Sequence, residues 1–365
     1  RDLPLLINQW ANVVRWEMRT RIFLRTSEFL WQEGHTAHAT ESEAMERTLQ
    51  MLDVYERLAH QYLAMPVVKG EKTASERFPG AVNTFTLEAM MQDKKALQAG
   101  TSHFLGQNFA KASQIKFQSP KEEEVYAWTT SWGVSTRLIG AIIMAHGDDN
   151  GLVLPPMIAS SHVAVMPIVK KADDRDRVMA YTDSVVKALR EQDYHGRRIE
   201  VEIDERETGG GRGWDWIKKG IPVRVEIGPR DIARNAVFVG RRDKGARDKA
   251  PMSREQFVKT IVPILDEIQS NLFGRALRFR EENSLQIDSR DDFYAFFTPK
   301  NLEKPEIHGG FALAHWCGNA GCEEEIKGNL GVTIRCIPMD AKEEVGRCIA
   351  CGNGSMQRVV FAKAY

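Results

Sequence analysis

The sequence has few cysteines, no long apolar run and no excess of either charge. Five cysteines in 365 residues are too few for a disulfide scaffold, and an odd number cannot all pair, so we expect a reducing compartment, the cytoplasm. No apolar stretch approaches the roughly 20 residues that span a bilayer, so no membrane partner is expected. Fifty basic and fifty acidic side chains cancel, so any contact with nucleic acid must come from a local patch.

The length and the punctuation of the chain indicate three regions. A chain of 365 residues with 42% hydrophobic content is long enough for two or three cores. A proline-marked connector, "NGLVLPPMIAS", begins at residue 150, and a charged stretch, "RFREENSLQIDSRDDF", follows residue 277. We therefore predict domains at 1–150, 151–275 and 276–365, and an α/β protein as a whole.

Local periodicity predicts the elements of the first two regions. Short β-like runs occupy residues 12–34, and an apolar stripe predicts a helix over 41–62. Thr40 and Glu43 have the spacing of a capping box at the start of this helix. After residue 160, strand and helix patterns alternate, which predicts a small α/β domain with a mixed or parallel sheet.

The cysteines near the end of the chain have the spacing of a metal site. Cys317 and Cys322 form one pair, and Cys348 and Cys351 form a second pair 25 residues later. Four thiolates at such spacing predict a structural Zn(II) site without an open position for chemistry. The alternative is four free, buried cysteines. Cys336 lacks a partner at this spacing and is expected in the core.

Three further segments carry weaker signals. Arg15 and Arg25 lie on consecutive strand-like runs of one hairpin, where two guanidinium groups can hold neighbouring phosphates, although surface arginines on hairpins are common. "LQAGTSHFLGQNF" (97–109) places polar residues around a glycine turn, or is an ordinary strand end. Arg137 starts an apolar helix, where a cation indicates an anionic or aromatic partner.

Together these segments resemble the class II aminoacyl-tRNA synthetases, and specifically the prolyl-tRNA synthetases of the archaeal and eukaryotic type. "VRWE" is similar to the opening of the family's motif 2, "RTSEFLWQEGHTAH" to its prolyl continuation, "GTSHFLGQNF" to its signature loop and "SWGVSTR" to its motif 3. "GIPVRVEIGPRD" (220–231) resembles the family's anticodon-binding domain. The resemblance implies an antiparallel-sheet catalytic domain, an α/β anticodon-binding domain and a small α+β zinc-binding domain.

The resemblance also implies an ATP site. Arg15 would hold the α-phosphate and Arg25 the γ-phosphate, while Phe29 and Arg137 would sandwich the adenine, with Mg(II) bridging phosphates. The α-phosphate gains charge when a carboxylate attacks it, so a fixed guanidinium suits this place. The implied catalytic residues are Arg15, Arg25 and Arg137, and the implied ATP-binding residues are Arg15, Glu17, Arg25, Phe29, Gln98, Thr101 and Arg137.

A proline pocket is implied beside the ATP site. A pyrrolidine ring with a secondary ammonium group needs apolar walls and a carboxylate. Without the resemblance, plain core packing is an equally good interpretation of Trp31 and Phe78. His35 and His38 lack a third ligand nearby, so we reject a metal pair there. The implied proline-binding residues are Trp31, Glu33, Phe78, His103, Ser131 and Gly133.

In the second domain, Glu226, Arg230 and Asp231 stand where the family reads anticodon bases. Guanine edges on unstacked bases suit Arg donors and carboxylate acceptors. The alternative is a structural ion pair between Arg230 and Asp231.

The resemblance also covers the last residue of the sequence. The family's terminal tyrosine implies that Tyr365 brings a carboxylate to the catalytic domain. The alternative is that "VVF" simply packs in the C-terminal lobe and Tyr365 has no such role.

The resulting interpretation is a proline-tRNA ligase with proline, ATP and tRNA(Pro) as partners. A homodimer is expected through motif 1, which lies upstream of "RDLPLLINQW", so the sequence looks N-terminally incomplete. The first alternative is a non-catalytic tRNA-binding or tRNA-sensing protein with a synthetase-like body. The second is a sister synthetase for threonine, histidine or glycine, which "WQEGHTAH" argues against.

Overall fold

The computed structural model describes residues 3–206, 211–301, 303 and 309–365. The chain divides into two compact units. The large unit comprises Arg1–His60, Pro66–Ala145 and Leu277–Tyr365, and the small unit comprises Gln61–Met65 and His146–Ala276. Within the described residues, every helix is too short or too polar to cross a membrane.

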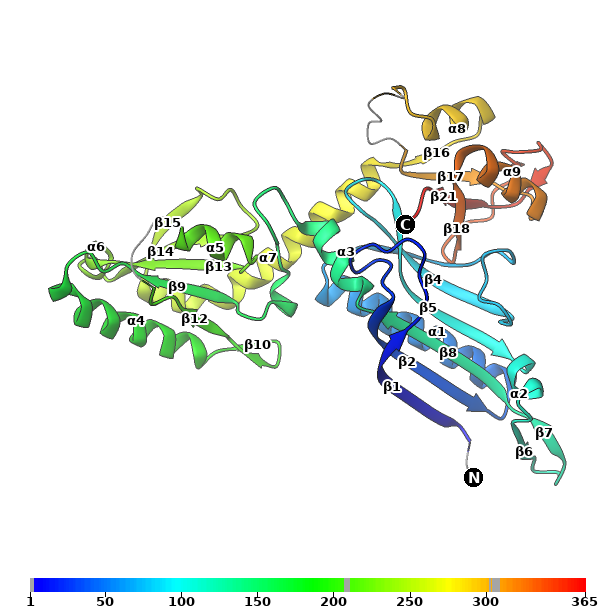
Figure 1. The fold of residues 1–365 in the computed structure, drawn as a ribbon, viewed down its shortest axis with the longest axis horizontal. Helices are drawn as coiled ribbons and strands as arrows, with labels where there is room; N and C mark the ends of the chain where they lie inside the picture. The colour runs from blue at the N-terminus through cyan, green and yellow to red at the C-terminus, as the bar shows by residue number, and fades with distance from the viewer. Residues whose placement is uncertain (1–2, 207–210, 302, 304–308) are drawn as a thin grey trace. The chain divides into compact units, whose positions relative to one another are not determined.

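A ten-stranded sheet forms the centre of the large unit (Figure 1). Its neighbouring strands are antiparallel except for the last pair, which is parallel. In spatial order the strands are β1 (Leu5–Val14), β2 (Glu28–His38), β8 (Trp128–Ser135), β5 (Ala96–Gly106), β4 (Asn83–Met90), β3 (Val67–Glu71), β18 (Thr333–Pro338), β21 (Arg358–Ala362), β17 (Phe311–His315) and β16 (Ser284–Gln286).

Helix α1 (Glu41–Arg57) packs across strands β2, β4, β5 and β8. The predicted capping box at its start is confirmed, because Glu43 N donates to Thr40 Oγ1 over 3.3 Å and Thr40 N donates to Glu43 Oε2 over 3.3 Å. A π-helical turn, Leu58–Tyr62, continues it to the predicted end. The buried face of α1 consists of Ala44, Thr48, Leu52 and Tyr55.

Two sequence predictions about local structure need correction. The hairpin at 12–34 exists, but Arg15 and Arg25 lie in the loop between β1 and β2 and not on the strands. The loop turns back on itself between Arg21 and Arg25, with Phe23 at a φ of 58°, so a strand cannot continue there. Likewise, Gly100 lies within strand β5 and not in a turn.

The C-terminal residues complete the large sheet. Strand β18 pairs with β3, where Ile337 stands opposite Glu71. A buried cluster then joins the two parts of the sheet, and it consists of Met90, Ala96, Phe311, Cys336, Val360 and Ala362. Cys336 is fully buried, as predicted. The other elements here are α2 (Asn108–Ala112), β6 (Lys116–Gln118), β7 (Glu124–Tyr126), α3 (Arg137–His146), α8 (Arg290–Phe297), α9 (Ala320–Leu330), β19 (Gly346–Arg347) and β20 (Gly354–Ser355).

The small unit has a five-stranded mixed sheet, as predicted. Its spatial order is β12 (Val201–Ile203), β9 (Val163–Pro167), β13 (Val223–Ile227), β14 (Ala236–Arg241) and β15 (Lys249–Ser253), and the first three strands are parallel. Its other elements are short 3₁₀ turns at Pro156–Ile158 and Ala172–Asp174, α4 (Arg175–Arg190), β10 (Asp193–Tyr194), β11 (Arg197–Arg198), α5 (Arg212–Lys218) and α6 (Pro229–Ile232).

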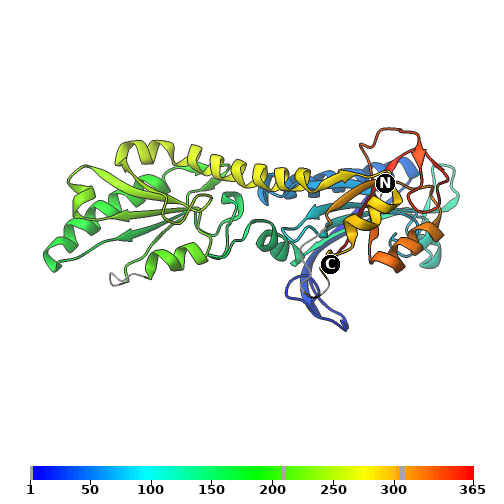
Figure 2. The ribbon, with the colours of Figure 1, turned by 90° about the horizontal axis from the view of Figure 1, so that it is seen from above.

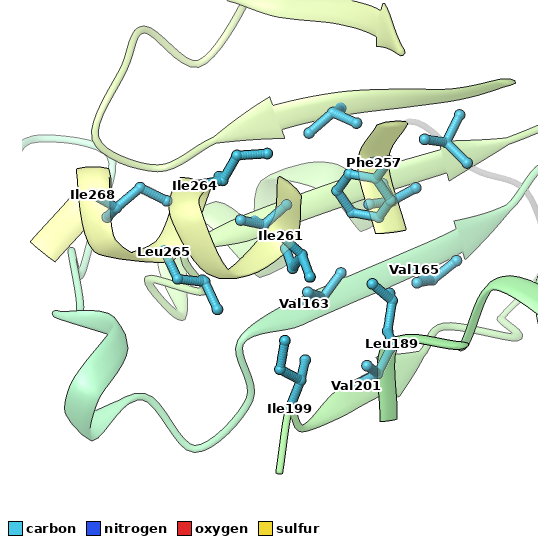
Figure 3. Close-up of a cluster of buried hydrophobic side chains, with 14 of the residues drawn as sticks. Val163, Val165, Leu189, Ile199, Val201, Phe257, Ile261, Ile264, Leu265 and Ile268 are labelled. Carbon is cyan, nitrogen blue, oxygen red and sulfur yellow. The ribbon is translucent and has the colours of Figure 1, made fainter. Parts of the chain in front are cut away.

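A long helix, α7 (Arg254–Glu282), supplies much of the core of the small unit (Figures 1 and 2). Phe257, Ile261 and Leu265 recur every four residues, so they lie along one face of the helix. They pack against Val163 and Val165 of β9, and all five side chains are fully buried (Figure 3). Burial of these apolar side chains stabilises the core of the small unit.

Candidate active site

A cleft of about 770 Å³ opens on strands β2, β5 and β8 of the large unit. Alternation along β2 decides which side chains reach it. Gln32 accepts a hydrogen bond from Tyr55 of α1, so it faces the helix. Its neighbours Trp31 and Glu33 therefore face the opposite side of the sheet, where the cleft lies.

The antiparallel register brings distant residues into rows across the cleft. Glu33 stands opposite Gly133, which stands opposite Thr101. One step along, Ser131 of β8 stands between His35 and His103. Directly opposed residues have Cβ atoms about 4.5–5.5 Å apart, so three short sequence motifs form one continuous wall.

Gly34 explains part of this local arrangement. A Cβ atom at Gly34 would lie 2.1 Å from Cε2 of Trp132, so the indole ring needs a residue without a side chain beneath it. The ring is buried and covers the helix-facing side of β2 at this point. A substitution here would push β2 and β8 apart directly beneath the row of Glu33 and Gly133.

One end of the cleft is rich in cationic groups. Arg137, the first residue of α3, donates from Nε to Leu24 O over 3.3 Å and from Nη1 to Gln98 O over 3.5 Å. Burial and the neighbouring charges of Arg15 and Arg25 lower the pKa of Arg137. Like charges gathered in a partly buried place favour an anionic ligand, which would relieve their repulsion.

Aromatic rings separate this cationic end from the rest of the cleft. The guanidinium carbon of Arg15 lies 4.9 Å from the ring centre of Phe29. Phe29 in turn meets Trp31 edge to face, with centroids 5.9 Å apart. Such a stack fixes the guanidinium group in place without using its hydrogen-bond donors, which stay available for a ligand.

The other end of the cleft combines aromatic rings with a carboxylate. Glu33 accepts from Gln9 Nε2 over 2.8 Å and lies 3.1 Å from His35 Nε2. The Phe78 ring is 4.8 Å from that of His103. Burial and the nearby His35 lower the pKa of His103 to about 4, so this imidazole is neutral near pH 7. The result is a small apolar space with one anionic wall.

Nearly all of the residues proposed for ATP and proline line this cleft. The two that do not are Glu17 and Arg25, which lie in the loop after β1. Sequence reasoning missed Arg77 and Thr84, which also line it. Thr84 accepts at Oγ1 from Phe78 N and lies 3.0 Å from His103 Nδ1. The only available signal for Arg77 was its place next to Phe78.

The four cysteines predicted to bind metal come together in the C-terminal part of the large unit. Their sulfur atoms all lie within 4.8 Å of one another, and Cys317 is 3.8 Å from Cys322 and 3.7 Å from Cys351. Zn–S bonds of about 2.3 Å in a tetrahedron place sulfurs about 3.8 Å apart. Burial opposes ionisation of Cys348, but backbone N–H groups outweigh it and lower its pKa to about 7. The donor set therefore fits a tetrahedral metal ion.

Tyr365 lies against the large sheet near the cleft strands. Its backbone N–H donates to Ala96 O over 3.3 Å, and Lys363 O accepts from Ala96 N over 2.8 Å. The phenol donates to Asp93, while Arg21 and Lys95 lie over the ring at 5.8 and 5.1 Å. Tyr365 is therefore held beside β5, the strand that carries Thr101 and His103.

The residues proposed for anticodon binding lie at the end of β13 in the small unit. Asp231 Oδ2 accepts from Gly228 N over 2.9 Å, which caps helix α6, and Glu226 pairs with Lys249. Arg230 is exposed on α6. Among the ion pairs of the described residues, none joins Arg230 to Asp231, so the structural ion pair is not formed here.

Three family models match this chain. They are the tRNA synthetase class II core domain (G, H, P, S and T) at residues 1–146, the anticodon binding domain at 162–263, and the C-terminal domain of prolyl-tRNA synthetase at 303–365. Together they account for both units and for the region of the cysteine cluster.

The relatives of this chain are similar over its full length. It is 56% identical to proline–tRNA ligase 2 of Anaeromyxobacter dehalogenans (strain 2CP-C) over 370 residues, which covers 100% of this chain and 72% of the relative. It is 55% identical to proline–tRNA ligase of Bdellovibrio bacteriovorus, again with 100% and 72% covered. A crystal structure of prolyl-tRNA synthetase from Cryptosporidium parvum complexed with L-proline and AMP superimposes with a TM-score of 0.88 at 36% identity, covering 100% of this chain and 76% of that one.

Proposed function

The chain belongs to the prolyl-tRNA synthetases of class II, and we propose how its residues divide the work of that family. It is a proline-tRNA ligase: it activates proline with ATP and transfers the prolyl group to tRNA. Class II synthetases use ATP together with magnesium. The observation that carries our assignment is one cleft with arginines at one end and an apolar, carboxylate-bearing space at the other.

We assign ATP to the cationic end. Arg15 would stabilise the α-phosphate while the proline carboxylate attacks phosphorus and the bond to pyrophosphate breaks. Charge grows on the α-phosphate oxygens in this step, so a guanidinium fixed against Phe29 acts mainly on the transition state. Arg25 and Glu17 would lie near the outer phosphates of ATP. Mg(II) would bind there and shield the negative charge of the phosphates. Phe29, Gln98, Thr101 and Arg137 would enclose the nucleotide.

We assign proline to the other end. The carboxylate of Glu33 would pair with the secondary ammonium, and the walls would be formed by Trp31, Phe78, His103, Ser131 and Gly133. His103 is neutral, so it can sit beside an apolar ring without carrying a charge into the pocket. After activation, a terminal ribose hydroxyl of tRNA(Pro) attacks the prolyl carbonyl and AMP leaves.

Other parts of the chain would support this reaction. Cys317, Cys322, Cys348 and Cys351 would hold a structural Zn(II), which would fix the fold of the C-terminal residues and take no part in chemistry. The carboxylate of Tyr365 would reach the catalytic site from its place beside β5. Glu226, Arg230 and Asp231 would read the anticodon of tRNA(Pro) within the small unit.

We further infer the archaeal and eukaryotic type for this chain, although the two relatives described above are bacterial. The structural neighbour from Cryptosporidium parvum, a eukaryote, supports this inference. We also propose that the protein forms a homodimer through motif 1 and works in the cytoplasm. We propose three domains, at residues 1–150, 151–275 and 276–365.

Pyrophosphate exchange across all twenty amino acids tests the substrate assignment. Proline alone should support rapid exchange. Replacing Phe78 with Ala should raise the KM for proline, because the variant loses a wall of the pocket, and should leave the KM for ATP close to its original value. If the Phe78→Ala variant shows an unchanged KM for proline in pyrophosphate exchange, the placement of proline at this end is contradicted.

A further inference from the structure

The loop 72–82, between β3 and β4, carries a wall of the cleft. Glu76, Arg77, Phe78 and Pro79 of this loop line it, and the Phe78 side chain is 44% exposed. The far part of the loop is tied to the core, because Phe78 N donates to Thr84 Oγ1 over 3.0 Å. The Phe78 ring lies beside those of His103 and Phe109 on the loop's cleft side, so its position depends on how the loop is held.

The near part of this loop is held by the C-terminal residues. Thr73 Oγ1 donates to Glu323 Oε1 over 2.9 Å, and Ser75 Oγ donates to Glu323 Oε2 over 2.5 Å. Glu76 pairs with Lys327 over 3.0 Å, one turn further along helix α9. The Glu323 carboxylate therefore accepts one hydrogen bond from each of two loop hydroxyls, which lie five and three positions before Phe78.

Buried charge also anchors the start of the loop. Lys72 Nζ lies 2.8 Å from Glu88 Oε1 and donates to Arg335 O over 2.8 Å. Burial opposes ionisation of Glu88, but the charges of Lys72 and Arg335 outweigh it and lower its pKa. This network fixes where the loop leaves β3, so the remaining freedom of the loop lies between Thr73 and Phe78.

Glu323 is well placed to remove that freedom. It is only 4% exposed, and it lies in the first turn of α9, where the helix dipole favours a carboxylate. Burial of a carboxylate is costly unless donors satisfy it, and here the hydroxyls of Thr73 and Ser75 do so. The preceding residue is Cys322, one of the clustered thiols, so a metal ion there would fix the start of α9 as well.

We infer that Glu323 is a positioning residue for proline: its carboxylate holds the loop 72–82 so that Phe78 stands against His103. The inference rests on the proline pocket proposed above. Without this contact the loop samples other arrangements, and the apparent affinity for proline falls by the fraction of molecules that hold the competent one. The nucleotide end of the cleft, built on Arg15 and Arg137, does not depend on this loop.

Replacing Glu323 with Ala tests the inference by steady-state pyrophosphate exchange. Hydrogen bonds to a charged group contribute about 1.5–3 kcal/mol and 1.4 kcal/mol is tenfold, so we expect the KM for proline to rise about tenfold or more. The KM for ATP and the zinc content should stay unchanged. Glu323→Gln keeps an acceptor for Thr73 and should recover most of the lost affinity. The matched control is Glu324→Ala, an exposed neighbour on the same helix.

The loop side supplies an independent variant. Ser75 is exposed, so Ser75→Ala removes one of the two hydroxyls with little effect on folding, and it should raise the KM for proline in the same direction. A raised KM for proline in Phe78→Ala, together with an unchanged KM in both Glu323→Ala and Ser75→Ala, would overturn the inference and leave the proline pocket standing. An unchanged KM in Phe78→Ala would overturn the pocket itself, and the inference with it.

Discussion

At the scale of single residues, the role proposed for Arg15 gives the sharpest prediction about catalysis. Arg15→Ala should lower kcat for pyrophosphate exchange by about 100-fold or more, because one oriented donor on developing charge contributes roughly 2.7–4 kcal/mol. Pre-steady-state formation of prolyl-adenylate measures this step.

The KM for proline is the internal control for Arg15. It should change little in Arg15→Ala, since the proposed proline end is built from other residues of the cleft. A fall in proline affinity with kcat preserved would assign Arg15 to substrate binding instead.

At the same scale, the sequence predicted which residue types matter better than it predicted their contacts. Arg15, Trp31 and His103 could be proposed because their motifs resemble those of a known family. Glu323 could not, because a glutamate on a charged helix is ordinary in sequence, and its partners lie 250 and 248 residues away. Such a contact exists only after the sheet has brought the two segments together.

Among the elements, helix α1 supports the cleft from beneath, because it packs on the strands that carry the site. Thr40→Ala removes the side chain that caps its first turn, and loss of such a cap costs about 1 kcal/mol. Amide hydrogen exchange in residues 41–57 should therefore become several-fold faster. Ser42→Ala, two residues on and exposed, should leave the exchange rate unchanged or slower. Equal rates in the Thr40 and Ser42 variants would show that tertiary packing alone holds the helix start.

Periodicity identified α1 and the sheet of the small unit, since each has one apolar face or one apolar run. It failed in the stretch between β1 and β2, where alternating side chains continue through residues that the backbone does not place in a strand. Phe23 adopts a positive φ there, and nothing in its side chain signals that conformation. This loop carries Arg15 and Arg25, the two residues proposed to hold phosphates of ATP.

For the whole molecule, the cysteine cluster gives the sharpest prediction. Purified protein should contain about one zinc per chain, because the four clustered thiols provide one tetrahedral binding site. Cys348→Ser should lose the metal and, since helix α9 and the loop 72–82 are joined through Glu323, should also raise the KM for proline. Metal analysis by emission spectroscopy and pyrophosphate exchange measure the two effects.

Cys336→Ala is the matched control for this experiment. Cys336 is a buried thiol outside the cluster, so its variant should keep the zinc. A zinc-free Cys348→Ser protein with ordinary proline kinetics would separate the metal from the pocket.

The pairing of β18 with β3 also has a consequence for the order of events during synthesis. Lys72, just after β3, and Arg335, in β18, are 263 residues apart. At about 5–20 residues per second, ribosomes need roughly 13–50 s to make the chain between them. Throughout that interval β3 has no partner on its outer side, and an unpaired edge is a place where nascent chains associate wrongly. Strand β18 closes this edge, so the timing of its arrival bears on how much of the protein folds correctly.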